Sequence, residues 1–525
     1  MDRPAAATRP DMRLDPAPPA RERLAARLLR GPLAVGLLAL AAVQLSTWVP
    51  HYLTWPLWTD HDVFATAARA WDLGEPPYRH SLGNNFPGTT YLFWSLGKLA
   101  GWGRSWPIYA LDAAGVVALG AVMLAWSHRR LGGPLPGAVG YLGLLGYLLN
   151  LDYSQAAQRD WHAPGLAVAG LMILESGRSR PRLVASAALA ALSLAIRPQA
   201  VLLVPAFLVS AGTGRRALAW ITVYAISTLA AFAPLATAGV LGDFGRALRV
   251  VGVGSEYGRA GGSGFLRELA QNLAGGRVLG LLAAAWLLSG AAEPAMQRTL
   301  RTWAVALAGL LLYKPISPQP HAYLDHPMAV GVAVGAAIVV ALIQQTPALP
   351  STIRLAAVAL ILAAGPVRPR FCNVSRSGSA VKTLMSGVEP ATAPLGYTRN
   401  LGVKVAGMYR WDDYRGVLAY LREHVDDSTQ VANALKGVPA LCGAVDRRSA
   451  LPAESVAWLR FVRSGDEPAF ASKLARDADS VVVWSPAEEA EGGFRLDILT
   501  AVIRRHYEPE ARFGAIEVWR RKGPR

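Results

Sequence analysis

The sequence predicts a polytopic α-helical membrane protein with a small C-terminal α/β domain. Of its 525 residues, 52% are hydrophobic and only 17% are charged, whereas a soluble domain usually carries about 25% charged residues. The long apolar runs lie within residues 31–366, and residues 367–525 have the mixed composition of a soluble domain. The change near residue 367 therefore separates a membrane domain from a C-terminal domain.

About eleven segments are apolar enough to be candidate membrane-spanning helices, which need roughly 20 mostly apolar residues each. The candidates are 31–50, 106–127, 134–151, 161–176, 183–197, 198–213, 217–238, 277–292, 301–314, 326–345 and 352–367. Residues 91–101 are about half the required length and contain Lys98. This segment is therefore predicted to be a helix at the membrane surface and not a span.

The arginines predict the orientation of these spans, because cytoplasmic loops carry an excess of Lys and Arg. With the N-terminus inside, the short cytoplasmic loops contain Arg129–Arg130, Arg178–Arg182, Arg215–Arg216, Arg298–Arg301 and Arg354. Residues 1–30 are then a disordered cytoplasmic arm. The long outer loops 51–105 and 239–276 and the C-terminal domain face the exterior. This pattern predicts a multi-pass protein of the plasma (inner) membrane.

The net charge of +17 does not indicate a nucleic-acid-binding protein. Such proteins gather Lys and Arg on one face or along one stripe, whereas these arginines are spread over short loops and the N-terminal arm. That distribution is typical of contact with anionic membrane lipids. We therefore expect membrane lipids, and no nucleic acid, among the partners.

The C-terminal domain is predicted to contain both helices and strands. Apolar residues at helical spacing predict helices over 414–425 and 496–506. Three short apolar runs predict strands over 431–435, 480–484 and 515–519. The two cysteines, Cys372 and Cys442, can form a disulfide outside the cytoplasm, but two cysteines suit unpaired thiols equally well.

Asp60 and Asp62 are the most informative residues of the chain. They lie two residues apart, just after the first predicted span, in the segment Trp58-Thr59-Asp60-His61-Asp62. A carboxylate beside a bilayer can act as a general base. Two acids at this spacing can also bind a divalent cation, or cap a helix predicted over 63–71. The pattern favours the chemical centre of a membrane enzyme and leaves these alternatives open.

A second polar group, Arg159, Asp160 and His162, lies between the third and fourth predicted spans. Charged residues at a membrane boundary are costly unless they are paired or face a wet cavity. Asp160 is predicted to be a second acidic group of the site, with a simple interfacial ion pair as the alternative. Arg197 lies between two apolar runs with almost no loop. It either binds a lipid-linked phosphate through charge-assisted bonds or snorkels to the surface.

The last predicted outer loop contains five residues that can contact a substrate: Lys314, His321, Tyr323, Asp325 and His326. Lys314 can meet a phosphate as a point charge. The spacing of the histidines matches no specific metal-ligand signature, so no metal ligands are assigned. The chain also contains no P-loop, HExxH or CxxC motif, which fits an enzyme whose activated donor carries its own energy.

Taken together, these residues resemble the GT-C glycosyltransferases, membrane enzymes that use polyprenyl-phosphate-linked sugars. The protein O-mannosyltransferase-like (family 39-like) and aminoarabinose-transferase-like members are most similar. In that family the first outer loop runs from an acidic pair through a short helix to a Pro-containing segment. Here these parts are Asp60-His61-Asp62, residues 63–71, and Glu75-Pro76-Pro77-Tyr78 with Phe86-Pro87-Gly88. Asp160 matches an acid of the second outer loop, and Tyr323-Leu324-Asp325-His326-Pro327 matches a motif of the last one.

The resemblance also has one departure. Relatives often have Lys-Pro-Pro where this chain has Asn85-Phe86-Pro87, so the lysine that contacts phosphate is missing there. Arg159, Arg197 and Lys314 are assigned to the donor phosphate in its place. The residues assigned to substrate binding are His61, His162, His321, Tyr323 and His326.

The function that the resemblance implies is transfer of a hexosyl or pentosyl group at the outer face of the membrane. The sugar moves from a polyprenyl-phosphate donor to a hydroxyl of a lipid, glycan or protein acceptor in the cell envelope. Asp60 or Asp62 acts as general base, and the anomeric centre is inverted. The main alternative is a lipid or solute transporter or flippase without transferase chemistry, which would carry charges at mid-depth within its spans. A non-catalytic sensor or assembly factor is a third interpretation.

Overall fold

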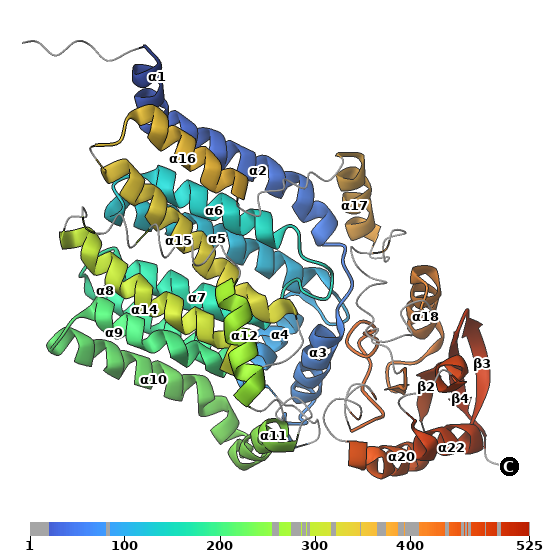
Figure 1. Ribbon diagram of the computed structural model, residues 1–525. Helices are drawn as coiled ribbons and strands as arrows, with labels where there is room; N and C mark the ends of the chain where they lie inside the picture. The colour runs from blue at the N-terminus through green and yellow to red at the C-terminus, as the bar shows by residue number, and fades with distance from the viewer. Residues whose placement is uncertain are drawn as a thin grey trace, which may run out of the picture.

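The computed structural model describes residues 20–79, 85–254, 262–274, 285, 290, 294–316, 322–346, 348–364, 374–386, 393, 409–435, 440–452, 456, 459, 464–477, 479–490 and 495–523. Long helices form a bundle, and a small α/β unit lies at one end of it (Figure 1). The predicted combination of an α-helical bundle with a small C-terminal sheet is therefore confirmed.

The bundle helices run side by side (Figure 1). They are α2 (Pro32–Tyr52), α5 (Trp106–Arg130), α6 (Pro134–Leu148), α7 (Arg159–Glu175), α8 (Arg180–Ile196), η1 (Pro198–Leu203) with α9 (Val204–Ala211), α10 (Arg215–Thr237), α14 (Pro294–Ile316), α15 (His326–Gln345) and α16 (Ser351–Ala364). Many of them have a proline at their first or second position, for example Pro32, Pro107 and Pro134. Proline is tolerated there because the first-turn N–H groups have no partner within the helix.

Helices occupy the predicted spans, apart from 277–292, most of which lies outside the described residues. Among the described residues, four helices are long and apolar enough to cross a membrane by length and composition: α2, α5, α10 and α15. The total of about eleven spans therefore stays a prediction. On α10, Leu218 and Leu229 are 65% and 72% exposed, whereas Val334 of α15 is fully buried. Large apolar side chains exposed along a whole helix fit contact with lipid.

Small residues bring the inner helices close together. A Cβ atom at Gly140 of α6 would lie 2.6 Å from the carbonyl oxygen of Ala333 in α15. At Gly309 of α14 it would lie 2.5 Å from the carbonyl oxygen of Leu202 in η1. Glycine at these positions permits the backbone approach that is common between helices in membranes.

Four shorter helices lie at the end of the bundle that carries the α/β unit: α3 (Thr59–Asp72), α4 (Pro87–Ala100), α11 (Leu241–Gly254) and α12 (Gly262–Ala274). The surface helix predicted over 91–101 corresponds to α4, whose Lys98 forms an ion pair with Asp72 of α3. The predicted outer loop 239–276 contains α11 and α12. A single turn, η3 (Ala322–Asp325), precedes α15.

The opposite end of the bundle carries α1 (Ala20–Leu29), which packs against α16. Residues 1–30 were expected to be disordered, and this expectation is wrong for residues 20–29. The physical reason lies in Glu22, whose carboxylate accepts the backbone N–H of Ser351 at 2.7 Å. A carboxylate at the N-terminus of α16 satisfies a backbone donor that has no partner within that helix.

The sheet near the C-terminus has the strand order β1-β2-β4-β3. Its strands are β1 (Gln430–Asn433), β2 (Ser480–Trp484), β3 (Tyr507–Phe513) and β4 (Ile516–Arg521). β1 and β2 are parallel, and β2–β4 and β4–β3 are antiparallel. The helices around it are α18 (Trp411–His424), α20 (Glu467–Arg476), α21 (Pro486–Ala490) and α22 (Asp497–His506), with the turn η4 (Ser464–Asp466) before α20. The helix α17 (Val374–Ser386) packs against α2 instead.

Three of these strands match the predicted ones, and β3 was missed. β3 is an edge strand with mostly exposed side chains and a proline, Pro509. Edge strands tolerate proline and need no continuous apolar run, so the sequence carries little signal there. The turn to β4 contains Gly514 at φ +59°, a left-handed conformation that glycine adopts without strain.

Candidate functional site

The two acids Asp60 and Asp62 lie in the first turn of α3. A helix was expected from residue 63, with the acids in the loop before it; the structure begins the helix at Thr59. Acidic side chains in a first helical turn interact favourably with the helix dipole. His61 contributes as well, because its Nδ1 accepts the backbone N–H of Trp58 at 3.4 Å.

Asp62 is buried against the C-terminal part of the chain. Its carboxylate accepts backbone N–H groups from Leu441 at 2.9 Å and Gly443 at 2.5 Å. Burial raises the pKa of Asp62 from 3.8 to about 6, although these backbone donors oppose the shift. Asp62 therefore holds the segment around residues 441–443 against α3.

Asp60 has different surroundings. It is half-buried, and within the described part of the chain its carboxylate makes no hydrogen bond and no ion pair. It lies only two residues from Asp62, whose side chain is 3% exposed. Of the two predicted acids, Asp60 is the one whose carboxylate is accessible in this arrangement.

The close contact at Gly443 gives a testable prediction. A Cβ atom there would lie 2.7 Å from Oδ1 of Asp62 and 2.8 Å from Cβ of Ala65. Gly443→Ala is expected to destabilise the protein by about 1–3 kcal/mol, because the extra methyl group overpacks this contact. Thermal unfolding of the purified protein measures the effect. Gly465→Ala is the control, since a Cβ at Gly465 would have no atom within 4 Å; equal stability of the two variants would contradict the contact.

The burial of Asp62 also predicts a pH dependence. The folded protein binds the Asp62 proton more tightly than the unfolded chain, because the folded-state pKa of about 6 lies above 3.8. This contribution to stability is full below the unfolded value and is lost as the pH rises through about 6. The unfolding midpoint of the wild type should therefore fall more than that of Asp62→Asn between about pH 5 and pH 7.5. Parallel pH profiles would show that Asp62 does not titrate in this range.

A second cluster forms around Asp160, which is fully buried. Arg197 donates from Nε to Oδ1 of Asp160 at 2.7 Å, and Nε of Arg159 lies 3.8 Å from Oδ2. Arg159 and Asp160 begin α7, and Arg197 directly follows α8, which ends at Ile196. Pairing is required here, since an isolated buried charge is very costly. The structure thus brings Arg197 together with Arg159 and Asp160, which belong to a different polar group in the sequence.

The cluster and the acidic turn of α3 are neighbours. The guanidinium carbon of Arg159 lies 5.1 Å from the ring centroid of Phe64, a cation–π distance. Phe64 follows Asp60 by four residues on the same helix, so both lie on one face of α3. The half-buried carboxylate of Asp60 and the guanidinium of Arg159 therefore lie along the same side of α3.

The predicted histidines bond to the protein itself. His61 is buried, and its Nε2 lies 3.2 Å from the carbonyl oxygen of Ala157. Burial lowers the pKa of His61 to about 4, so its ring is neutral at pH 7. His326 uses both ring nitrogens, Nδ1 with the hydroxyl of Tyr147 at 2.7 Å and Nε2 with the carbonyl oxygen of Gln155 at 2.8 Å. These rings hold the walls of the site, and direct substrate binding by them stays a prediction.

Asp112, which lies beside His162, was not predicted from the sequence as a candidate residue. The carboxylate of Asp112 is buried within α5 and accepts from the hydroxyl of Tyr52 at 2.7 Å and Nε1 of Trp161 at 2.5 Å. Nε2 of His162 lies 2.7 Å from Oδ1 of Asp112. A signal was available, because an acid within an otherwise apolar helix is unusual and costly unless it is paired.

The last outer loop is described in part. Lys314, at the end of α14, pairs with Asp325 at 2.8 Å and with Glu268 of α12 at 3.4 Å. The loop therefore balances this cation with two carboxylates, and its contact with a phosphate stays a prediction. His321 and the side chain of Tyr323 lie outside the described residues.

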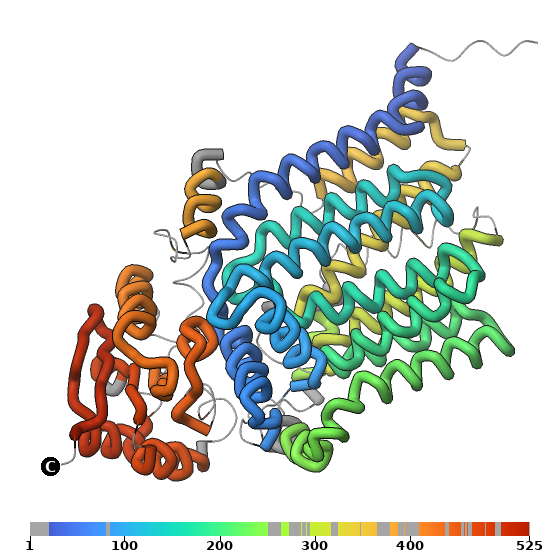
Figure 2. Tube along the Cα trace, turned by 180° about the vertical axis from the view of Figure 1, so that it is seen from behind, coloured from blue at the N-terminus to red at the C-terminus, as the bar shows by residue number. Residues whose placement is uncertain are grey.

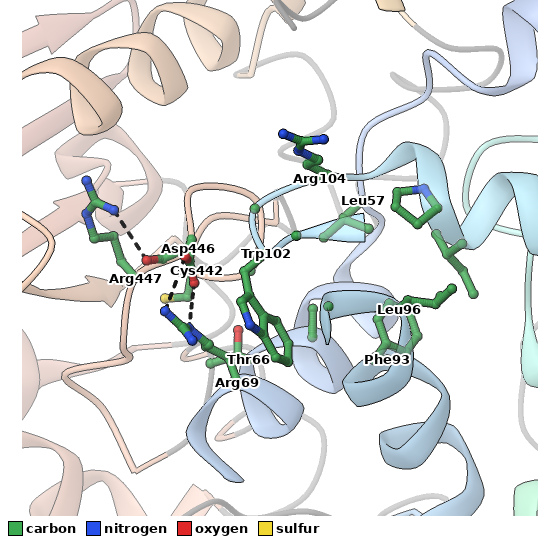
Figure 3. Close-up of a pocket in the computed structure, with 17 residues that line it drawn as sticks. Leu57, Thr66, Arg69, Phe93, Leu96, Trp102, Arg104, Cys442, Asp446 and Arg447 are labelled. Carbon is green, nitrogen blue, oxygen red and sulfur yellow. Dashed lines mark hydrogen bonds and ion pairs between the residues drawn. The ribbon is translucent and has the colours of Figure 1, made fainter. Parts of the chain in front are cut away.

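Two cavities lie between α3 and the C-terminal part of the chain. The smaller one is bounded by Arg69, Trp102 and Cys442, and Figure 3 shows Arg69 reaching Asp446 there; Nε and Oδ1 are 2.9 Å apart. The larger cavity, about 430 Å³, is lined by the second half of α3 and by polar residues that include Arg448. Its volume is in the range of small-molecule sites.

Of the two cysteines, Cys442 lies within the described residues. Cys442 is buried, with its thiol 3.4 Å from the carbonyl oxygen of Val431. Cys372 lies outside the described residues. Among the residues that the structure describes, no three His, Cys, Asp or Glu side chains converge to hold a metal ion.

The fold of this chain is similar to that of solved structures of another protein, ArnT. The chain is similar to the crystal structure of ArnT from Cupriavidus metallidurans bound to undecaprenyl phosphate, with a TM-score of 0.59, 13% identity, and coverage of 93% of this chain and 98% of that chain. The apo state of ArnT gives a TM-score of 0.58, 12% identity, and coverage of 93% and 97%. No protein-family model matches the sequence, and no curated protein matches it. The chain therefore shares the fold of ArnT over nearly its whole length, in agreement with the fold that the sequence resemblance predicts.

Proposed function

We propose that this protein transfers a sugar from a polyprenyl-phosphate donor to an acceptor hydroxyl at the outer surface of the membrane. The observation that carries the proposal is that Asp60 lies near the cluster of Arg159, Asp160 and Arg197. This arrangement combines an accessible carboxylate with buried guanidinium groups at one end of an apolar helix bundle. The fold adds support, since one structure that shares it holds undecaprenyl phosphate.

In the proposed reaction Asp60 is the general base. The carboxylate of Asp60 takes the proton of the acceptor hydroxyl while that oxygen forms a bond to the anomeric carbon. The bond from the anomeric carbon to the phosphate oxygen breaks on the opposite face, so one displacement inverts the anomeric centre. The polyprenyl phosphate leaves with the bonding electron pair.

The two arginines serve the leaving phosphate. Arg159 and Arg197 stabilise its charge through charge-assisted hydrogen bonds, and Lys314 adds a third cation from α14. Asp160 has a positioning role, because its carboxylate holds Nε of Arg197 at 2.7 Å. Preorganised charges of this kind need no rearrangement during the reaction.

We also propose the topology predicted from the sequence, with residues 31–366 as the membrane domain and 367–525 as an extracytoplasmic domain. The arginine-rich loops then lie in the cytoplasm, as the positive-inside rule expects. Asp62 and the segment around residues 441–443 join the two parts beside Asp60. The cavity of about 430 Å³ next to α3 is the proposed route for the lipid, glycan or protein acceptor.

Mass analysis of envelope lipids and glycans tests this function in the cell. Deleting the protein should remove one sugar modification, and the wild-type gene should restore it while the Asp60→Asn gene should not. Unchanged glycans and lipids after deletion would contradict a transferase function.

One observation favours a second function, transport of a lipid or solute. Asp112 is a buried acid within α5, bonded to His162, and such groups mark ion pathways in transporters. Uptake by vesicles that contain the purified protein, with no sugar transferred, would favour transport over transfer.

A further inference from the structure

A cavity of about 440 Å³ is lined by residues at one end of the helix bundle. Figure 2 shows that this end of the bundle is remote from α3 and the sheet. The ends of α5, α7, α9, α10 and α14 surround it. Six arginines line it: Arg129, Arg130, Arg178, Arg216, Arg298 and Arg301. The positive-inside rule accounts for arginines in these loops, but it does not require them to converge on one cavity.

Within the described residues, the positive charge around this cavity is balanced only in part, by Glu175. Arg216 donates to the carbonyl oxygens of Leu174 and Gly177. In the part of the chain that the structure describes, the other five arginines form no ion pair. Glu175, the one acid of the lining, is 4% exposed and accepts the indole N–H groups of Trp126 and Trp303 at 2.9 and 2.7 Å. An anion in the cavity would relieve the repulsion among the guanidinium groups.

The helix ends do not all act in the same direction, because α10 and α14 begin at this cavity whereas α5, α7 and α9 end there. Arg216 lies in the first turn of α10, and Arg298 lies near the start of α14. An arginine at a helix N-terminus is unfavourable, because it adds to the positive end of the dipole. The same helix ends favour a bound anion. The C-terminal ends of α5, α7 and α9 oppose this effect, so the six arginines, and not the helix dipoles, select a negatively charged ligand.

We propose that this cavity binds the phosphate-bearing headgroup of an anionic membrane phospholipid. Guanidinium groups form bidentate bonds to phosphate oxygens. The lining also includes Val209, which is 45% exposed, and the surrounding helices present apolar side chains to lipid. A headgroup whose acyl chains lie along these helices uses both the cationic and the apolar surface. Inorganic phosphate shares the charge but would use only the cationic part.

Native mass spectrometry of the purified full-length protein, with phosphatidylglycerol or phosphatidylcholine added in detergent, tests the proposal. The wild type should retain phosphatidylglycerol in preference to phosphatidylcholine. Arg298→Gln with Arg301→Gln should weaken that retention on the order of 30-fold, as expected for two arginines near a lipid phosphate. Arg129→Gln with Arg130→Gln, on another helix, should weaken it similarly. Arg180→Gln with Arg215→Gln is the matched control, since these arginines lie at the same end but do not line the cavity.

Three results would overturn the proposal. Retention that is equal for the wild type and both cavity variants would show that the cavity binds no headgroup. A loss as large in the Arg180/Arg215 control would show a general charge effect. Protection against thermal unfolding by inorganic phosphate, without selective retention of phosphatidylglycerol, would assign the cavity to free phosphate. Size-exclusion profiles matching the wild type establish that the variants are folded.

Discussion

Asp60→Asn is expected to lower kcat for sugar transfer by about 10²–10⁴-fold, the usual contribution of a general base. Asparagine has nearly the same shape as aspartate but cannot accept the acceptor's proton. Within the described residues the Asp60 carboxylate has no bonded partner, so the substitution removes only its interaction with the helix dipole and should lower the free energy of unfolding by less than about 1 kcal/mol. Initial rates with a labelled polyprenyl-phosphate sugar and saturating acceptor measure the effect.

Asp62→Asn is the informative comparison for this experiment. The Asp62 carboxylate holds Leu441 and Gly443, so its loss should lower stability and reduce kcat far less than Asp60→Asn. If Asp62→Asn abolished transfer while its unfolding midpoint stayed at the wild-type value, Asp62 would be the base and the assignment to Asp60 would be wrong. Wild-type rates in Asp60→Asn would contradict it as well.

Arg197→Met is expected to destabilise the protein by about 3–5 kcal/mol, the usual consequence of leaving one partner of a buried ion pair uncompensated. The partner is Asp160, which is fully buried and bonded to Nε of Arg197 at 2.7 Å. The double variant Arg197→Met with Asp160→Leu should recover part of the lost stability, because it removes the uncompensated carboxylate but also takes that carboxylate away from Arg159, 3.8 Å from it. Unfolding in mixed micelles measures both variants.

The double variant also separates stability from function. It should be folded yet transfer little sugar, since the donor phosphate would lose one of its cations. Full activity in a stable double variant would show that Arg197 serves the fold and not the donor phosphate. A stable Arg197→Met single variant would show that the ion pair carries little of the folding energy.

Much of this site could be predicted from the sequence, because burial is costly for charged groups. Acids and arginines at the ends of apolar runs made Asp60, Asp160 and Arg197 candidates, and the structure places Arg197 against Asp160. Local periodicity located most helices and three of the four strands. The first-turn position of Asp60 and Asp62 was within a few residues of the prediction, as helix boundaries commonly are.

The features of the site that could not be predicted from the sequence depend on contacts between distant segments of the chain. The partners of Asp62 lie 379 and 381 residues away, and nothing in the local sequence indicates them. The pairing of Arg197 with Asp160 required the relative positions of α7 and α8. Asp112 was missed because one acid in a long apolar run was counted as part of a span. The cation-lined cavity at the other end arises from five helix ends that only the fold brings together.

The most direct test of the central claim uses the purified wild-type protein in proteoliposomes with a panel of labelled polyprenyl-phosphate sugars and envelope acceptors. A single displacement at the anomeric carbon should give equal amounts of glycosylated acceptor and free polyprenyl phosphate. NMR should show that the anomeric configuration of the product is inverted relative to the donor. A product with retained configuration would contradict the single displacement. Movement of label across the bilayer without any glycosylated product would contradict a transferase altogether.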